Sequence, residues 1–206
     1  MVRRIGIMGG TFDPIHMGHL ITAEMVRADA HLDEVLFIPS ARPPHKDGAR
    51  AASAEDRLTM TQYAVQENPF FSVSDIELRR DGLSYTVDTI RELRTALGDA
   101  EIFFITGADA MNDLYLWHEP EQLLRSCQFI VATRQGVPLD EILIAEKFAA
   151  EERSHITVLP TPHLEISSTT IRARIRAGLS IRHLVPRAVE EYIEKRGLYR
   201  EHDEKL

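Results

Sequence analysis

The sequence has few of the features that mark secreted, membrane-bound and polyanion-binding proteins. Its single cysteine, Cys127, allows no internal disulfide and lies in an apolar run, so we expect a buried thiol and a reducing, cytoplasmic setting. The apolar stretch Ile5 to Gly10 is too short for a signal peptide, and no run approaches the length of a membrane span. With 24 Lys and Arg against 32 Asp and Glu, the formal net charge is −8. This surplus of acid argues against a nucleic-acid polymer or a membrane as partner, because both are bound through broad basic surfaces.

Length and composition are those of an ordinary globular protein. The chain has 206 residues, of which 44% are hydrophobic and 27% are charged. We expect one domain over residues 1–206, with a core over about 1–165 and a small helical C-terminal part over about 166–206.

Apolar runs of strand length alternate with segments of helical periodicity. The runs predict six strands: Arg4–Met8, Glu34–Pro39, Phe71–Ile76, Glu101–Thr106, Gln128–Thr133 and Ile156–Leu159. This alternation predicts an α/β fold, a Rossmann-like doubly wound parallel sheet with helices on both faces. In such sheets ligands bind at the carboxyl ends of the strands.

Helix signals stand between the predicted strands. The spacing of Ile21, Met25, Ala28 and Leu32 predicts the buried stripe of the first helix. Ser53 is expected to cap a second helix, and Ser84 or Thr86 a third. A last helix is expected from about Pro186 to Gly197.

The loop after the first strand carries the clearest chemical signal. Gly9 and Gly10 leave room for backbone N–H groups to approach a phosphate, and a helix begins near Gly18 with its positive end toward the same place. His16 and His19 are three residues apart, so both imidazoles can face one anion as hydrogen-bond donors. A metal site would need further ligands, and none stands at a suggestive spacing. A purely structural pair is the other alternative.

The string Gly9-Gly-Thr-Phe-Asp-Pro-Ile-His-Met-Gly-His19 resembles the His-x-Gly-His signature of the nucleotidyltransferase superfamily, and in particular the adenylyltransferases that make precursors of NAD and coenzyme A. The resemblance implies in-line attack of a substrate phosphate on the α-phosphorus of ATP, with His16 and His19 stabilising the transition state. It implies Mg²⁺ as cofactor, held by the ATP phosphates and by no protein ligand. The ATP-binding residues that it implies are Gly9, Gly10, Thr11, Phe12, His16, His19, Gly107, Asp109, Ser167, Ser168 and Arg172.

Some of these residues begin a capped helix near the end of the chain. Ile166-Ser-Ser-Thr-Thr-Ile-Arg172 resembles an element of the superfamily that wraps the ATP phosphates with hydroxyls, helix N–H groups and an arginine. By the resemblance, Arg172 also counts among the catalytic residues. Taken alone, the segment predicts only a helix with a good N-cap.

Other motifs resemble the nicotinate mononucleotide adenylyltransferases. A loop with Pro43-Pro-His-Lys46 resembles their contact to the phosphate of the mononucleotide, and Ser84-Tyr-Thr86 at a helix start resembles their site for the pyridine carboxylate. Trp117, the only tryptophan, resembles the residue that stacks on the nicotinate ring, although a lone tryptophan is more often core. The expected substrate-binding residues are His45, Lys46, Ser84, Tyr85, Thr86, Trp117 and Arg134, of which Arg134 could equally be a surface ion pair. His118 receives no role.

The expected partners are therefore ATP and nicotinate mononucleotide, with a homo-oligomer left open. Two alternatives stay beside this interpretation. One is an adenylyltransferase acting on nicotinamide mononucleotide or phosphopantetheine, and the other is a nucleotide-binding sensor without turnover.

Overall fold

The computed structural model describes residues 2–42, 52–133, 139–162 and 164–200. Six strands form one sheet in the order β3-β2-β1-β4-β5-β6, and every neighbouring pair is parallel. The strands are β1 (Arg4–Gly10), β2 (Glu34–Pro39), β3 (Phe71–Val73), β4 (Glu101–Gly107), β5 (Gln128–Thr133) and β6 (Ile156–Pro160). The predicted Rossmann-like parallel sheet is confirmed.

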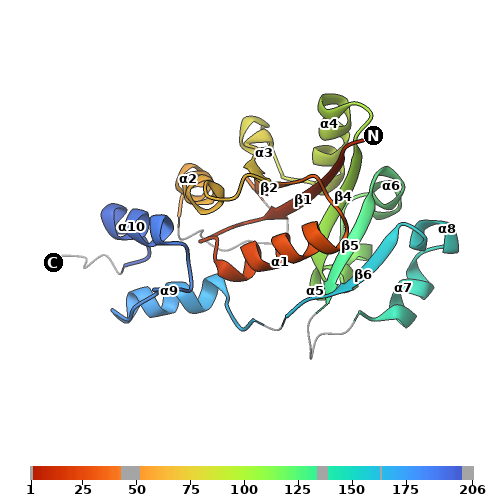
Figure 1. Ribbon diagram of the computed structural model, residues 1–206. Coiled ribbons are helices and arrows are strands. Elements are labelled where there is room, and N and C mark those ends of the chain that lie inside the picture. Colours follow the sequence, from red (N-terminus) through yellow and green to blue (C-terminus); the bar gives the residue numbers. More distant parts are fainter. Residues whose placement is uncertain (1, 43–51, 134–138, 163, 201–206) are drawn as a thin grey trace.

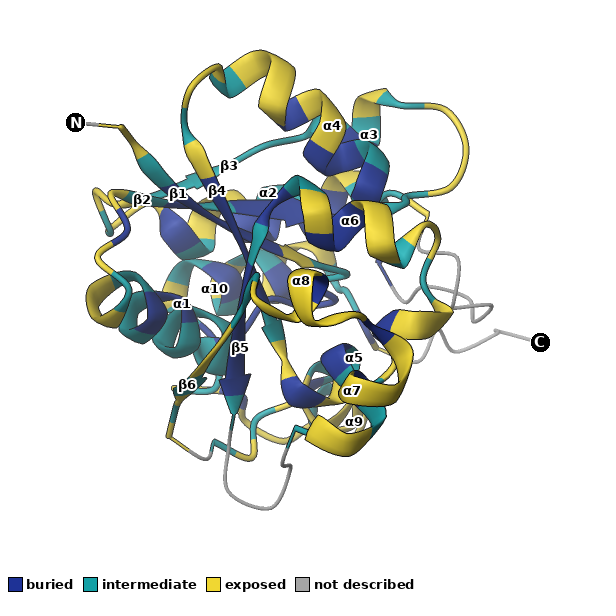
Figure 2. Ribbon diagram, turned by 90° about the vertical axis from the view of Figure 1, so that its right-hand side faces the viewer, coloured by how far each residue is buried: buried dark blue, intermediate teal, exposed yellow. Residues whose placement is uncertain are grey.

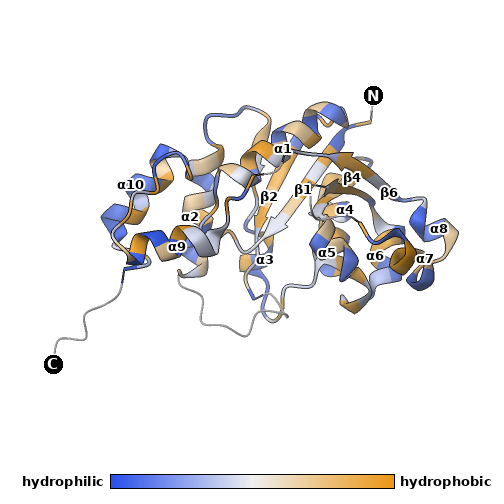
Figure 3. Ribbon diagram, turned by 90° about the horizontal axis from the view of Figure 1, so that it is seen from below, coloured by the Kyte–Doolittle hydropathy of each residue, from blue (hydrophilic) through white to orange (hydrophobic). Residues whose placement is uncertain are grey.

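Helices cover both faces of the sheet (Figure 1). They are α1 (Met17–Asp29), α2 (Ala54–Val65), α3 (Ile76–Arg79), α4 (Thr86–Leu97), α5 (Ala108–Asn112), α6 (Pro120–Ser126), α7 (Glu141–Lys147), α8 (Ala150–Arg153), α9 (Ser168–Arg176) and α10 (Arg187–Arg196), with a 3₁₀ turn η1 (Leu114–Leu116). The two C-terminal helices, α9 and α10, lie at one end of the molecule beside α2, and α7 and α8 lie at the other (Figures 1 and 3). In the part of the chain that the structure describes, no helix is long and apolar enough to cross a membrane.

The core has two layers, because successive side chains of a strand point to opposite faces. In β4, Ile102 and Phe104 join a cluster with residues of α4 and α6, whereas Phe103 and Ile105 join a cluster with residues of α1, α2 and α10. Buried residues accordingly follow the strands, and exposed ones gather on the outer helices (Figure 2). Cys127 is 3% exposed, as expected, and burial raises the pKa of its thiol to about 12.

Two local predictions need correction. The third strand ends at Val73 instead of Ile76, because the short helix α3 begins at Ile76 with Asp75 as its N-cap. The predicted stripe of α1 is only partly right: Ile21 and Met25 are half-buried and Ala28 is exposed. Leu32 is buried but lies beyond the end of the helix, whose buried residues are Ala23 and Val26. Helix α1 therefore packs against the core through a face centred on Ala23 and Val26.

Caps at the helix ends were predicted with mixed success. Ser53 caps α2 by accepting from the N–H of Asp56, and Gly197 ends α10 in the left-handed conformation, both as predicted. Pro186 is the N-cap of α10 and not part of its first turn. Helix α4 has Tyr85 at the N-cap with no side-chain hydrogen bond, so neither Ser84 nor Thr86 caps it.

Gly6 in β1 is required by close packing. A Cβ there would lie 2.8 Å from Leu32 Cδ1 and 2.9 Å from Ile105 Cδ1. We therefore expect Gly6→Ala to destabilise the protein by about 1–3 kcal/mol, the usual scale for overpacking a filled core. Urea unfolding measures this, with Gly107→Ala as the matched control because an added Cβ there meets nothing within 4 Å. Equal stability of the two variants would contradict the prediction.

Candidate active site

A cavity of about 570 Å³ opens at the carboxyl ends of β1 and β4, the two central strands. Connections run outward in opposite directions from this pair, so the loops that follow them diverge and leave a crevice. The predicted residues that line the cavity are Gly9, Gly10, Thr11, His16, His19, Ser84, Tyr85, Thr86, Gly107, Trp117, Ser167 and Ser168. The first and the last of the predicted motifs thus meet at one place, although almost the whole chain lies between them.

Several predicted residues are not on the cavity wall. Phe12 is 2% exposed and packs edge-on against His19, with ring centroids 5.1 Å apart. Asp109 is exposed in the first turn of α5, and Arg172 reaches the loop after β1. His45, Lys46 and Arg134 lie outside the described residues.

The two imidazoles lie face to face. The ring centroids of His16 and His19 are 3.7 Å apart and the ring planes differ by 24°. Gly18 makes room for this arrangement, since a Cβ there would lie only 3.1 Å from His16 Nδ1. The expected convergence of both histidines on one space is therefore found, with the cavity beside them.

A backbone hydrogen bond defines the tautomer of neutral His19. The N–H of His16 donates to His19 Nδ1 at 3.2 Å. An imidazole nitrogen that accepts a hydrogen bond carries no proton, so the proton of neutral His19 sits on Nε2. His19 can then donate through Nε2 to an anion.

His16 is held in its neutral form by burial. The residue is 7% exposed, and desolvation lowers its pKa to about 4. A neutral imidazole still donates through one nitrogen. The site can therefore offer hydrogen bonds to phosphate oxygens without a permanent charge on this ring.

A fully buried arginine lies beneath the loop. Arg57 of α2 is 0% exposed, and its Nη1 donates to the carbonyl oxygens of Thr11 at 2.6 Å and Ser40 at 2.8 Å. These two residues follow β1 and β2, so one guanidinium joins both loops and places a positive charge next to the cavity. Sequence reasoning missed Arg57, because the two carbonyl oxygens that it contacts stand 46 and 17 residues away along the chain.

Ser84 fastens the start of α4 to the loop after β2. Its Oγ accepts hydrogen bonds from the N–H groups of Ala41 at 3.1 Å and Arg42 at 3.0 Å. The hydroxyl is therefore engaged outside the helix, which explains why it does not cap α4. Since no side chain caps this helix end, its first N–H groups suit an anionic ligand.

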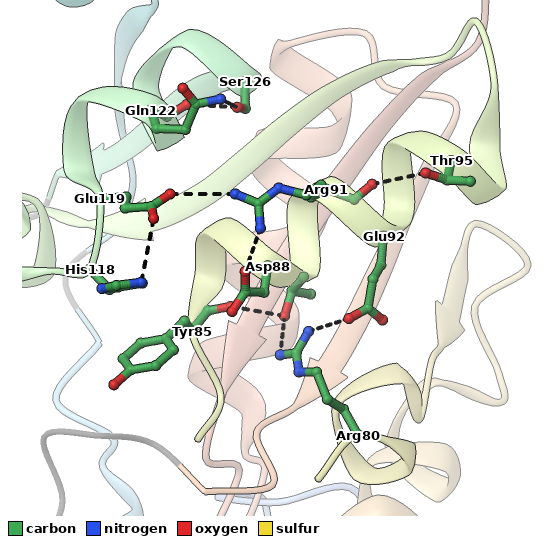
Figure 4. Close-up of polar contacts among 11 residues, drawn as sticks. Arg80, Tyr85, Asp88, Arg91, Glu92, Thr95, His118, Glu119, Gln122 and Ser126 are labelled. Carbon is green, nitrogen blue, oxygen red and sulfur yellow. Dashed lines mark hydrogen bonds and ion pairs between the residues drawn. The ribbon is translucent and has the colours of Figure 1, made fainter. Parts of the chain in front are cut away.

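Ion pairs brace the first turns of α4 (Figure 4). Arg80 contacts Glu92 at 2.6 Å and Thr89 Oγ1 at 3.0 Å, and Thr89 in turn donates to Glu77 Oε1 at 2.7 Å. Glu77 lines the cavity, and burial raises its pKa. Sequence reasoning assigned no role to this buried carboxyl.

Aromatic rings flank the far side of the cavity. Trp117 packs edge-on against Phe104, with centroids 6.2 Å apart at 88°, and is half-buried on the cavity wall. Tyr85 and His118 lie with ring centroids 4.3 Å apart, so His118, which received no role from the sequence, is part of the same wall. Figure 4 shows His118 directed toward Glu119, 3.6 Å away.

Residues at the start of α9 face the loop after β1. Ser167 caps α9 by accepting from the N–H of Thr170, as predicted. Ser168 Oγ donates to the carbonyl oxygen of Pro14 at 2.9 Å, and Arg172 Nη1 donates to that of Asp13 at 2.7 Å. Their predicted contact with the triphosphate stays a prediction, while their contact with the loop is part of the structure.

The lowered pKa of His16 makes the folding stability depend on pH. The unfolded chain takes up a proton on this residue below about pH 6.5, whereas the folded protein does so only below about pH 4. Folding stability should therefore fall as the pH is lowered from about 6.5 to about 4, by up to ~1.4 kcal/mol per pH unit from this residue. Urea unfolding across this range should give a shallower fall for His16→Asn, and parallel curves would contradict the prediction.

Comparisons with known proteins identify the family of the chain. Residues 7–174 match the model of the cytidylyltransferase-like family. Two similar proteins carry the name "Probable nicotinate-nucleotide adenylyltransferase". The one from Desulfitobacterium hafniense strain Y51 is 48% identical over 199 residues, which cover 96% of each chain. The one from a strain of Thermus thermophilus is 49% identical over 197 residues, which cover 96% of this chain and 100% of that one. The solved nicotinic acid mononucleotide adenylyltransferase of Plasmodium falciparum in complex with NaAD has the same fold, with a TM-score of 0.78 at 21% identity over 96% of this chain and 97% of that one. The chain therefore belongs to the cytidylyltransferase-like family and, within it, to the nicotinate-nucleotide adenylyltransferases.

Proposed function

We propose that the protein transfers the adenylyl group of ATP to nicotinate mononucleotide, giving nicotinate adenine dinucleotide (NaAD) and pyrophosphate. The observation that carries this proposal is a single cavity that joins the paired imidazoles to the uncapped start of α4 and to Trp117. One end suits phosphates and the other suits an aromatic ring with a carboxylate. The full-length relatives named for this activity support it, as does a solved protein of the same fold that carries NaAD.

The proposed reaction needs no general base. A phosphate oxygen of the mononucleotide is already ionised at neutral pH and attacks the α-phosphorus of ATP, forming a new P–O bond. The bond from the α-phosphorus to the bridging oxygen breaks, and pyrophosphate leaves with that electron pair. The barrier is the repulsion between anions and the charge that develops on the leaving group, so positioned donors are the useful catalysts.

The loop after β1 would supply these donors. His19 Nε2–H and the ring of His16 face the cavity next to the backbone N–H groups that follow Gly9 and Gly10. Buried Arg57 and the N-terminal end of α1 add positive potential from below. We assign Arg172 and Ser168 to the triphosphate side, where they would act together with the loop carbonyls that they hold.

A divalent cation would enter with the nucleotide. Within the described ranges, no cluster of three or more His, Cys, Asp or Glu side chains is placed to hold a metal ion. The lining is rich in imidazoles, hydroxyls and glycine backbone, which suit phosphate oxygens better than Mg²⁺. We therefore propose Mg²⁺ carried by the ATP phosphates, where it neutralises charge on the leaving group.

The acceptor end would select the carboxylate. The uncapped N–H groups at the start of α4 attract an anionic ring substituent, whereas the NH₂ of nicotinamide would turn a donor toward donors. His45, Lys46 and Arg134 are proposed for the mononucleotide by resemblance alone. The single-domain organisation and a homo-oligomeric state also stay predictions.

Acceptor identity is tested by pyrophosphate release with ATP and Mg²⁺. We expect release with nicotinate mononucleotide, at least about tenfold less with nicotinamide mononucleotide, and none with phosphopantetheine. Because both pyridine nucleotides share the phosphate and ribose, their ratio reports only on the ring substituent. A preference for nicotinamide mononucleotide or phosphopantetheine would replace the proposed substrate, and tight ATP binding without release with any acceptor would favour a sensor.

His19→Ala should lower the turnover number by about 10²–10³, the usual loss when one transition-state donor is removed. The matched control is His31→Asn, a change at an exposed histidine just after α1 whose left-handed backbone asparagine tolerates. Steady-state pyrophosphate release gives both values. A turnover number for His19→Ala within about twofold of the control would remove His19 from the mechanism.

A further inference from the structure

The C-terminal part of the chain holds the loop that carries the two histidines. In the part of the chain that the structure describes, residues of and around α9 and α10 hydrogen-bond to residues 13–17 at several points. Three involve loop backbone: Arg172 Nη1 to Asp13 O at 2.7 Å, Ser168 Oγ to Pro14 O at 2.9 Å, and Met17 N–H to Leu184 O at 2.9 Å. A further bond engages a loop side chain: Tyr199 Oη donates to Asp13 Oδ1 at 2.7 Å.

Tyr199 makes this bond from a buried position. It is 6% exposed, and Asp13 is 7% exposed. The backbone of Tyr199 has φ +66°, an uncommon left-handed conformation for a residue other than glycine, shortly after the end of α10. This conformation turns the ring inward, toward Met60 of α2 and the loop. Burial and the neighbouring carboxylate raise the pKa of Tyr199, so the hydroxyl keeps the proton that it donates.

Asp13 is close to the reacting groups along the chain. It stands between Phe12, whose ring packs edge-on against His19, and the Pro14-Ile15 step that leads to His16. His16 and His19 act through directional hydrogen bonds, so their effect depends on the position of this backbone. A displacement of about 1 Å at such a site can cost about 10² in rate.

We propose that Tyr199 is a positioning residue for adenylyl transfer. Its hydroxyl holds the Asp13 carboxylate and thereby fixes the turn that presents His16 and His19 to the cavity. The C-terminal helical part is thus a brace for the phosphate loop. The expected loss of kcat rests on the proposed function, whereas the expected fixing of residues 13–17 does not.

The chain contains a matched control in Tyr192. Its Oη donates to Asp56 Oδ1 at 2.8 Å, again from the C-terminal part to an aspartate, but this contact ends on α2 and not on the loop. Asp56 keeps Ser53 and Arg196 as partners when the Tyr192 hydroxyl is removed. Tyr192→Phe therefore deletes a comparable tether without releasing residues 13–17.

The experiment compares Tyr199→Phe, Tyr192→Phe and the unaltered protein. We expect Tyr199→Phe to lower kcat for pyrophosphate release by about 10–10², with KM for the mononucleotide within about twofold, because the acceptor wall is formed by α4 and the segment after η1 instead. Tyr192→Phe should keep kcat within about twofold. Tyr199→Phe should lower the thermal midpoint more than Tyr192→Phe, because its hydroxyl is buried whereas Asp56 keeps Ser53 and Arg196 as partners. The split between kcat and KM therefore carries the comparison, since a merely structural role would not lower kcat at unchanged KM.

Amide hydrogen exchange provides a readout that needs no activity. Backbone amides of residues 11–19 should exchange at least about tenfold faster in Tyr199→Phe than in Tyr192→Phe, because the first releases the loop and the second does not. If the unaltered protein releases no pyrophosphate with any acceptor, the proposed function fails, and the exchange comparison still decides the role of Tyr199. Equal exchange, or equal losses of kcat in both variants, would overturn the inference.

A second pair of variants covers a failure of Tyr199→Phe to fold. Asp13→Asn keeps a side-chain oxygen that accepts a hydrogen bond from the Tyr199 hydroxyl. The double variant D13N/Y199F removes this hydroxyl as well, and it leaves no buried charged carboxylate beside the phenyl ring of residue 199. Faster exchange of residues 11–19 in the double variant than in Asp13→Asn supports the brace. The same exchange rate in both would count against it.

Discussion

The work of the site depends on a fixed position of the turn that follows β1. Its useful groups are backbone N–H donors and two imidazoles, of which His16 is neutral because it is buried. Neutral donors act over short distances and narrow angles, unlike a lysine or arginine charge that attracts from afar. The turn must therefore be held in place from all sides. Phe12 packs against His19, Arg57 holds the Thr11 carbonyl from below, and the C-terminal part grips Asp13, Pro14 and Met17.

This arrangement explains how a chain with a net charge of −8 can take two anionic substrates. Positive potential is provided locally: Arg57 is completely buried beside the loop, and α1 and α4 both begin next to the cavity, with the positive ends of their dipoles there. Charge placed in a region of low dielectric acts more strongly than charge on the surface, where solvent screens it. The acidic exterior then discourages long polyanions without weakening the cavity.

Local patterns predicted many of the residues that line the cavity, because these residues sit in short contiguous strings. Gly9 to His19, Ser84 to Thr86 and Ser167-Ser168 each show their chemistry within a few residues, and the carboxyl-end rule for parallel sheets places them together. Arg57, Glu77 and Tyr199 escaped detection for the opposite reason. Their partners stand 46, 12 and 186 residues away, so nothing in the neighbouring sequence distinguishes them from ordinary helix or loop positions.

The sequence by itself determined the order of the strands and of the main helices, the parallel sheet that this order demands, and the identity of the groups proposed to meet phosphate. Those properties follow from hydrophobic period and from residues close together along the chain. Tertiary structure decided the rest: which face of α1 is buried, why Ser84 leaves α4 uncapped, and why Arg172 bonds a carbonyl in the loop. Each of these depends on hydrogen bonds and packing between distant segments, which a one-dimensional pattern does not encode until the sheet has brought those segments together.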